Sequence, residues 1–482
     1  MPLNHRGPRA CIPAFAGYAR MVTDGGSVMW LRRDLRVRDH PALQQAAQDG
    51  PLTVLFVLDD ALRKPSGGPR LAFLYRALRS LAAELEQHGG RLTVRRGKPE
   101  NVVPKVVAET GAHSVYVTGD HGPYGRARDE RVERALPDGV ELVRVSSPYV
   151  NAPGTVMKDN GELFKVYSPY YRAWRKHGWD PPARMQLGRT TWADPVDSTA
   201  IPADPRLDVD ELPDATEDGA RAAWADFLED KIADYDTDRD RPDRPGTSRM
   251  SVYLKYGLLH PRTLLADLGD RSGSGPETYR QELAWREFYA TVLHVFPESA
   301  REYYDPKLAA MPYDTGAEAD EHFHAWATGT TGYPIVDAGM RQLLATGWMH
   351  NRLRMITASF LTKDLHIEWQ RGARHFMQHL VDGDLASNNH GWQWVAGSGT
   401  DASPYFRIFN PFTQGEKFDP SGEYVRRWVP ELREVDAPGK KIHRPWELAT
   451  PPAGYPERIV DHATERARSL EDYQKLKETA SA

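Results

Sequence analysis

The chain has 482 residues, of which 40% are hydrophobic and 27% are charged, a composition typical of a globular protein large enough for two domains. The formal net charge of -5 excludes a protein that is basic over its whole surface, although a local basic face remains open. The single cysteine, Cys11, excludes an internal disulfide framework and a multi-cysteine metal site. We therefore expect a cytoplasmic protein in a reducing compartment.

Residues 1–26 contain arginines and small residues but no apolar run long enough for a signal peptide or a membrane span. We interpret this segment as a disordered leader. We expect no membrane association.

Residues 27–150 alternate short β-branched runs with helical patterns. The alternation predicts right-handed crossovers and a doubly wound parallel sheet, an α/β fold that binds ligands at the carboxyl ends of its strands. No G-x-G-x-x-G follows the first strand and no G-x-x-x-x-G-K-[ST] occurs, which disfavours a dinucleotide dehydrogenase and a P-loop enzyme. The predicted strands are residues 27–31, 52–58, 91–95, 114–117 and 141–145, with helices at 70–88 and 101–110 between them.

Residues 151–219 are predicted to connect two domains, because the stretch from about 196 to 215 is rich in proline and aspartate and lacks apolar periodicity. From residue 220 to residue 482 the patterns are helical, without a second set of alternating strands. The sequence thus predicts an α/β domain followed by a larger all-α domain.

Glu282, Trp285, Arg286 and Tyr289 recur at i, i+3, i+4 and i+7, so they share one face of a predicted helix. A carboxylate, an indole, a guanidinium and a phenol make a poor core surface. A functional site and a charged face packed against another helix are equally compatible with this pattern.

Two further clusters lie downstream. Asn351, Arg354 and Met355 share a helical face, which alone is weak support because a methionine at helical spacing usually belongs to a core. In residues 382–394, two aspartates flank a glycine, and Asn388 precedes Trp392 by one helical turn. N-capping would explain the acids but not the asparagines and tryptophans crowded behind them.

Tyr235 and residues 246–251 bring hydroxyls, backbone N–H groups and an arginine close to a helix start, which suits a phosphate. Ordinary N-capping would use the same serine and threonine. His322 and His324 could indicate a metal, but alternate residues diverge on a helix, so we expect no metal site.

In this order the segments resemble the photolyase/cryptochrome family, and specifically its class I cyclobutane pyrimidine dimer (CPD) photolyases. The resemblance implies an α/β antenna domain at residues 27–150 and a helical domain at residues 220–482 that binds FAD and DNA. It extends over nearly the whole chain, through residues 30–36, 246–251, 282–288, 331–335, 348–355, 382–394 and 407–411.

The resemblance implies FAD as the cofactor. Arg354 and Asp382 would pair, and Asn388 would face the ring nitrogen whose protonation follows reduction, where a neutral amide tolerates reduced flavin. The FAD-binding residues would be Tyr235, Thr247, Ser248, Arg249, Met250, Ser251, Arg286, Arg354, Asp382, Asp384 and Asn388.

The activity implied is light-driven repair of UV-damaged DNA by a carbon–carbon lyase, in which excited reduced FAD gives an electron to a flipped-out dimer. Glu282 and Asn351 would be the catalytic residues, with the pKa of Glu282 raised in a dry pocket. Trp285 and Trp394 would form the wall on which the dimer stacks. The other DNA-binding residues would be Arg352, Met355, Arg407 and Lys417. We expect a monomer without an obligate protein partner.

Trp392 and Trp369 match the two inner members of the family's electron-transfer chain. Residues 312–320 contain no tryptophan where the outer member is expected, and Tyr313 is a substitute.

Residues 120–128, with Asp120, together with Lys255 resemble members that bind 8-hydroxy-5-deazaflavin as antenna rather than methenyltetrahydrofolate. Gly122 departs from this pattern, because an acidic residue is expected there.

Three alternatives have different signatures. A cryptochrome photosensor is opposed by Asn388 and by a chain that ends soon after Tyr473. A 6-4 photolyase would carry a histidine in place of Asn351. A thermally driven flavin oxidoreductase has no nicotinamide fingerprint in its favour.

Overall fold

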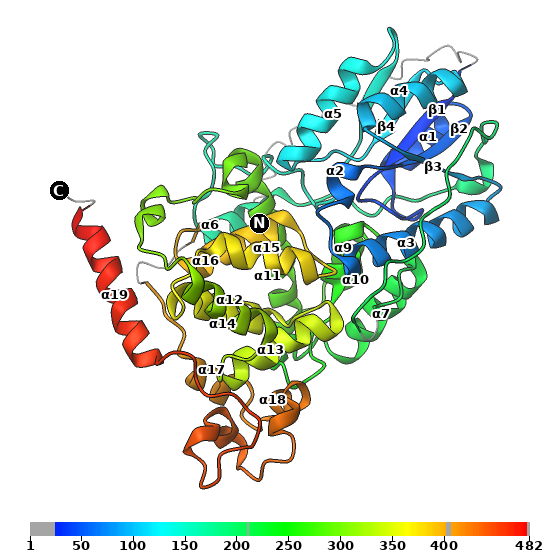
Figure 1. The fold of residues 1–482 in the computed structure, drawn as a ribbon. Helices are drawn as coiled ribbons and strands as arrows, with labels where there is room; N and C mark the ends of the chain where they lie inside the picture. Colours follow the sequence, from blue (N-terminus) through cyan, green and yellow to red (C-terminus); the bar gives the residue numbers. More distant parts are fainter. Residues whose placement is uncertain (1–24, 210–211, 402–405, 480–482) are drawn as a thin grey trace, which may run out of the picture.

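The computed structural model describes residues 25–209, 212–401 and 406–479, and Figure 1 shows an N-terminal α/β part next to a larger helical part. The leader predicted for residues 1–26 therefore lies, apart from its last two residues, outside the described residues. The predicted fold class is confirmed: an all-parallel sheet with the order β3-β2-β1-β4-β5 precedes a region of helices. The strands are β1 (Ser27–Leu31), β2 (Leu52–Leu58), β3 (Leu92–Arg96), β4 (Ser114–Val117) and β5 (Glu141–Arg144).

Helices cover both faces of the sheet, which is why its strands read as continuous apolar runs. Met29 pairs in register with Val54 on β2 and Tyr116 on β4, and these three side chains pack toward α1 and α3. Trp30 and Leu55 point to the opposite face, toward α4 and α5. The helices of this part are α1 (Pro41–Gln48), α2 (Asp60–Arg63), α3 (Gly68–Gln87), α4 (Pro99–Thr110) and α5 (Pro123–Ala135).

The helical part surrounds the long helix α11, which packs against α6, α8 and α16. Its helices are α6 (Tyr167–His177), α7 (Glu217–Asp230), α8 (Tyr235–Asp238), α9 (Met250–Tyr256), α10 (Pro261–Leu268), α11 (Ser274–Val295), α12 (Ala317–Thr328), α13 (Pro334–Thr346), α14 (Asn351–Lys363), α15 (Trp369–His379), α16 (Leu385–Ala396), α17 (Pro411–Phe418), α18 (Glu423–Trp428) and α19 (His462–Thr479). Short 3-10 turns are η1 (Leu187–Arg189), η2 (Pro297–Ala300), η3 (Pro306–Ala310), η4 (Pro430–Leu432), η5 (Gly439–His443) and η6 (Pro445–Glu447).

The predicted linker, residues 151–219, is not a structureless connection. It contains α6, whose buried face consists of Tyr167, Tyr170 and Trp174 at spacings of three and four. These aromatic residues pack with the main apolar cluster of the molecule. This helix was not predicted because the proline- and aspartate-rich stretch further along dominated the composition of the segment, and the bounds of the linker stay a prediction.

A glycine allows α15 and α16 to approach each other closely. A Cβ atom on Gly372 would lie 2.1 Å from Cη2 of Trp392 and 2.6 Å from Cδ2 of Leu361. Gly372→Ala is therefore expected to destabilise the protein by about 1–3 kcal/mol through overpacking, measured by chemical denaturation. The matched control is Gly391→Ala on α16, where a Cβ atom would meet nothing within 4 Å. This substitution should stabilise the protein by about 0.5–1 kcal/mol. Equal effects of the two substitutions would contradict the packing argument.

Candidate active site

A cavity of about 840 Å³ lies at the carboxyl ends of the strands. The strand order reverses between β1 and β4, and the cavity is lined by Arg33, which follows β1, and Asp120, which follows β4. Doubly wound sheets bind their ligands at such a switch point. The facing wall belongs to the helical part and includes Lys255, Trp369 and Asp384. Both parts of the molecule thus build this cavity.

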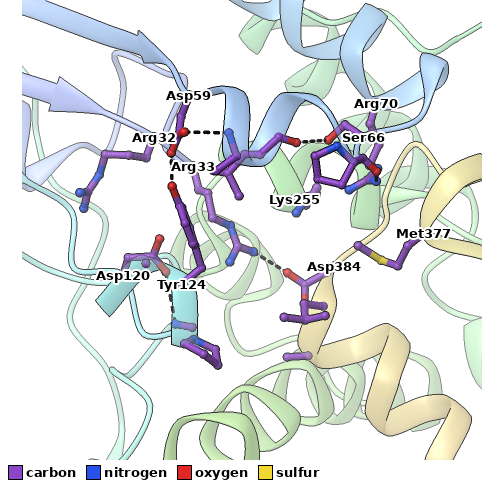
Figure 2. A pocket seen from close by; sticks show the side chains of 18 of the residues that line it. Arg32, Arg33, Asp59, Ser66, Arg70, Asp120, Tyr124, Lys255, Met377 and Asp384 are labelled. Carbon is purple, nitrogen blue, oxygen red and sulfur yellow. Dashed lines mark hydrogen bonds and ion pairs between the residues drawn. The ribbon is translucent and has the colours of Figure 1, made fainter. Parts of the chain in front are cut away.

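Figure 2 shows Arg33 reaching across the cavity to Asp384, with Nη2 2.5 Å from Oδ2. Burial raises the pKa of Asp384, but Arg33 and Lys255 outweigh that effect and hold it well below its usual range. Burial and then repulsion from Arg33 lower the pKa of Lys255 to about 7. The cavity is therefore crossed by a paired guanidinium and contains a lysine whose pKa lies close to neutrality.

The two predicted antenna residues, Asp120 and Lys255, line this same cavity. The Asp120 carboxylate accepts hydrogen bonds from Arg128, at 3.2 Å, and from the backbone N–H of Gly122, at 3.3 Å. Burial raises the pKa of Asp120, but Arg128 and Arg33 lower it below its ordinary value, so the group is ionised. The structure thus brings together two residues that are 135 positions apart in the sequence.

A second cavity, of about 320 Å³, lies at the start of α9. Arg249 adopts a left-handed conformation there (φ 53°), a costly one for a residue with a side chain and frequent at functional sites. The hydroxyls and cations that line the cavity are those of Thr247, Ser248, Lys231, Arg244, Arg249 and Arg427.

Three donors in the wall of this second cavity lack partners among the described residues, namely Nε1 of Trp348, Nε1 of Trp428 and Nε2 of His350. Burial lowers the pKa of His350 to about 4, so its ring is neutral. Because its Nδ1 accepts from the backbone N–H of Arg352 at 3.2 Å, the proton is on Nε2. Unused donors, hydroxyls and cations form a set that fits a diphosphate and its sugar.

The predicted pair of Arg354 and Asp382 is present, with Nη2 2.9 Å from Oδ2. The carboxylate also accepts a hydrogen bond of 2.6 Å from Ser251, and Nε of Arg354 donates to the carbonyl of Met349 at 2.8 Å. The aspartate side chain is 2% exposed and the arginine 25%. The carboxylate is thus enclosed by protein, while the guanidinium keeps an exposed edge.

Tyr235 and Met250 are buried behind the start of α9. The ring of Tyr235 packs edge-on against Tyr279 at 5.1 Å, and the hydroxyl of Tyr279 lies 2.9 Å from Oγ of Ser248. These two predicted cofactor residues therefore support the second cavity from behind and are absent from the residues that line it.

Arg286 and Asn388 are held by carbonyl groups. Arg286 donates to the backbone oxygens of Pro148, at 3.1 Å, and Leu254, at 3.3 Å. The amide nitrogen of Asn388 donates to the carbonyl of Ala373, at 3.1 Å, and to the side chain of Asn389, at 2.9 Å. Both N–H groups of the Asn388 amide are engaged within the protein, so its oxygen is the atom that can face a ligand.

Two residues of the predicted stripe on α11, Glu282 and Trp285, contact side chains from other parts of the chain. Glu282 forms an ion pair of 2.8 Å with Arg239, and its carboxyl remains 31% exposed although burial raises its pKa. Trp285 lies flat on Tyr167 of α6, with ring centroids 3.7 Å apart and planes 8° apart. One face of the indole is therefore covered by protein.

The residues predicted on α14 contact each other, the turn after α8 and α17. The amide nitrogen of Asn351 lies 3.8 Å from the sulfur of Met355. Arg352 is paired with Asp240 at 2.6 Å, and its guanidinium and the ammonium of Lys417 lie 4.3 and 5.0 Å from the ring centroid of Phe418. Two of the three predicted phosphate contacts thus flank a single aromatic ring.

The third predicted phosphate contact, Arg407, is exposed and lies beside the four residues 402–405 that the structure leaves undescribed. Its backbone oxygen accepts a hydrogen bond from the buried Lys363. Trp394 is partly buried and packs against the core of the helical part. Contacts between these two residues and the stripe on α11 are not among those described, so their place at the same pocket stays a prediction.

Trp392 and Trp369 are buried, at 3% and 1% exposure. Trp369 meets Tyr303 edge to face at 6.1 Å, and Tyr303 lies 6.2 Å from Tyr313. The aromatic path from Trp369 thus continues through Tyr303, which the sequence analysis did not identify, to Tyr313, which it did.

Four partners of the predicted residues escaped the sequence analysis: Arg33, Tyr167, Arg239 and Asp240. Arg239 had a detectable signal, since residues 238–244 alternate acids and bases directly before the phosphate-binding pattern. Tyr167 lies at the start of an aromatic stripe within the predicted linker. For Arg33 no local signal exists, because its partner is 351 positions further along the chain.

Within the described ranges, no cluster of three or more histidine, cysteine, aspartate or glutamate side chains could hold a metal ion. The same part of the chain contains no helix that is both long and apolar enough to span a membrane.

Comparison with known proteins agrees with this geometry. Residues 27–186 match the family model described as DNA photolyase, and residues 279–475 match the FAD binding domain of DNA photolyase. A deoxyribodipyrimidine photo-lyase of Streptomyces griseus is 40% identical over 92% of this chain and 98% of its own length. The match to the Escherichia coli (strain K12) deoxyribodipyrimidine photo-lyase is also 40% identical, over 93% and 98% of the two chains.

Solved structures show the same relationship. A bacterial class III photolyase from Agrobacterium tumefaciens superimposes with a TM-score of 0.88 at 35% identity, over 96% of this chain and all of the other. A cryptochrome of Synechocystis sp. PCC6803 superimposes with a TM-score of 0.84 at 27% identity, over 93% and 99% of the two chains. The chain therefore belongs to the DNA photolyase family.

Proposed function

We propose that the protein repairs cyclobutane pyrimidine dimers in DNA with light absorbed by bound FAD. The observation that carries this proposal is the network that joins α11 to α14: Glu282 pairs with Arg239, and the next residue, Asp240, pairs with Arg352. It places a half-buried carboxyl between cations, close to the indole of Trp285. Carboxyl, indole and cations are the groups needed to bind a dimer of two neighbouring bases that has left the DNA helix, together with the phosphates on either side of it.

The second cavity and the helices around it would hold the cofactor, which when bound supplies the excited-state electron that opens the dimer. Thr247, Ser248, Arg249 and Ser251 would bind its phosphates, with Met250 packed behind them and with Trp348 and His350 donating their free N–H groups. Support comes from the unpartnered donors in the cavity wall. Arg286, Arg354, Asp382, Asp384 and Asn388 would orient the ring system, with the Asn388 oxygen accepting from a protonated ring nitrogen, and Tyr235 would brace this site from behind.

On the substrate side, Trp285 would offer its free face to the dimer, with Trp394 opposite and Met355 and Asn351 beside it. Glu282 would act in its neutral form and donate a hydrogen bond to a base carbonyl that gains negative charge. Support comes from the raised pKa of Glu282, which burial causes. Arg352, Arg407 and Lys417 would bind phosphates, which makes binding salt-sensitive despite the acidic total charge.

Trp392 and Trp369 would conduct electrons from the surface to the cofactor, and the path would end at Tyr313 through Tyr303. The ring separations of 6.1 and 6.2 Å along this path support it.

The cavity of about 840 Å³ would hold the antenna chromophore, 8-hydroxy-5-deazaflavin, with methenyltetrahydrofolate as the alternative. Support comes from Asp120 and Lys255, which line the cavity together with Arg33. Mass analysis of the chromophores released on denaturation distinguishes the two.

A cryptochrome-type photosensor is the alternative function, favoured by the close superposition on the Synechocystis cryptochrome. The experiment that separates the two is illumination of the reduced, FAD-loaded protein with thymine-dimer oligonucleotides. We expect thymine absorbance to recover under blue light and to stay constant in the dark. Binding of the oligonucleotide without any recovery would reject repair and favour the photosensor.

Glu282 provides the matching variants for that assay. Glu282→Ala should lower the repair yield per absorbed photon severalfold while it changes dimer binding less, because the lost hydrogen bond acts on the charged state. Glu282→Gln retains a neutral donor and should keep more of the yield. If alanine and glutamine give equal losses, donation by a neutral carboxyl is wrong.

A further inference from the structure

The turn after α8 alternates acids and bases from Asp238 to Arg244, and we call residues 238–244 the charged turn. Two of its ion pairs are internal: Arg244 binds Asp238 at 2.9 Å, and Arg241 binds Asp243 at 2.5 Å. The internal pairs satisfy four of the six charges. The remaining two, on the consecutive residues Arg239 and Asp240, are directed outward.

Arg239 and Asp240 each bind a residue of a different helix. Arg239 pairs with Glu282 of α11 at 2.8 Å, and Asp240 pairs with Arg352 of α14 at 2.6 Å. In the proposed function, Glu282 binds the damaged base and Arg352 binds a phosphate. In the absence of nucleic acid, the charged turn thus occupies both groups.

These two pairs are suited to exchange. The side chains of Arg239 and Glu282 are 27% and 31% exposed, and those of Arg352 and Asp240 are 19% and 38% exposed. Ion pairs with such access to solvent gain little from each other. A DNA phosphate offers an arginine a bidentate partner and also releases counterions, so it competes well for both guanidinium groups.

We propose that Arg239 is a positioning residue that keeps Glu282 ionised until nucleic acid binds, and that the phosphates flanking the lesion then take Arg239 and Arg352 as partners. The inference rests on the proposed function. Glu282 and Asp240 are left without cations, and Glu282 takes up a proton from solvent. The neutral carboxyl is the form that donates to the damaged base.

The electrostatic surroundings of Glu282 fix the sign of this change. Burial raises its pKa, Arg239 and Arg352 lower it, and Asp240 raises it. Loss of the two cations therefore raises the pKa of Glu282 further. At any pH between the pKa of the free protein and that of the DNA complex, binding is accompanied by proton uptake. The other groups that face Glu282 are phenols, whose own pKa values burial raises, so they stay neutral: Tyr167, Tyr235, Tyr279 and Tyr289.

Calorimetric titration in the dark tests this directly. The FAD-loaded full chain is titrated with a duplex that carries one thymine dimer and with the undamaged duplex, in two buffers of different ionisation enthalpy, which gives the number of protons taken up. We expect uptake with the damaged duplex that disappears in Glu282→Gln. Arg239→Gln should take up fewer protons than the wild type, because Glu282 already holds its proton, while Arg239→Lys should fall between them.

The matched control is Arg241→Gln, which removes a cation from the same turn without a contact to Glu282. It should retain the wild-type uptake. Infrared spectra without DNA give an independent readout: Arg239→Gln should show a protonated carboxyl band that is missing in the wild type and in the Arg239→Gln/Glu282→Gln double variant.

The outcomes separate the two proposals. The role of Arg239 is overturned if the damaged duplex binds preferentially but proton uptake does not depend on Glu282. It is also overturned if Arg239→Gln takes up as many protons as the wild type. Both results leave the repair proposal intact. Uptake that depends on Glu282 and Arg239 but no light-driven repair overturns the proposed function and supports the role of Arg239. Equal affinity for the two duplexes overturns both.

Discussion

Replacing Asp382 with alanine is expected to yield protein without bound FAD. The carboxylate holds Arg354 at 2.9 Å and Ser251 at 2.6 Å, and its side chain is only 2% exposed. Removal of one partner from a buried pair costs about 3–5 kcal/mol, and the lower end applies because Arg354 keeps some access to solvent. The measurements are the ratio of flavin to protein absorbance and the free energy of unfolding.

The control for this substitution is an ion pair of similar length at the surface. Asp314 and Arg468 lie 2.5 Å apart and are 38% and 41% exposed. Asp314→Ala should cost at most about 1 kcal/mol and should leave the flavin content unchanged. Full flavin occupancy in Asp382→Ala would show that the pair of Arg354 and Asp382 is not part of the cofactor site.

Trp285→Ala is expected to weaken binding of a dimer-containing duplex by about ten- to a hundredfold, because a base stacked on an aromatic ring gains about 1–3 kcal/mol. Tyr167 covers one face of this indole, so a ligand can stack only on the other. Trp285→Phe keeps an aromatic face and should retain most of the affinity. Fluorescence anisotropy with damaged and undamaged duplexes is the measurement.

A distant tryptophan controls for loss of aromatic area. Trp192 packs against Gly90 beside the sheet and donates to the carbonyl of His88, so Trp192→Ala should leave DNA affinity unchanged. If Trp285→Ala weakens binding of the damaged and the undamaged duplex equally, the indole supports the fold rather than the dimer.

The sheet was predictable almost residue by residue. β1, β2 and β4 coincide with the predicted runs, because strands buried on both faces need continuous apolar sequence with polar breaks at their ends. α6 was not predicted because its apolar pattern is short and discontinuous. Its three buried aromatic residues make a short stripe inside a segment whose average composition is that of a linker.

Within the candidate site, only contacts between residues of the same helix could be predicted from the sequence pattern. Groups on one helix, such as Asn351 and Met355, were correctly brought together by their spacing. The partners from elsewhere in the chain, Arg239 for Glu282 and Arg33 for Asp384, depend on how α8 and the sheet pack against the helical part. The alternating charges of residues 238–244 indicate that Arg239 belongs to a charged segment, but no local pattern says which distant residue Arg239 or Arg33 pairs with. The resemblance supplied the pairing of Arg354 with Asp382.

Asp384 has two positions at once: it caps the N-terminus of α16 through the backbone N–H of Ser387, and it binds Arg33 across the cavity between the two parts of the molecule. α16 also carries Asn388, Trp392 and Trp394. A pigment in that cavity and a flavin beside Asn388 would thus be referenced to the same helix. Because the pair of Arg33 and Asp384 ties this helix to the sheet, it would help to hold the two chromophores at a fixed separation and mutual angle, which is the geometric part of the efficiency of energy transfer.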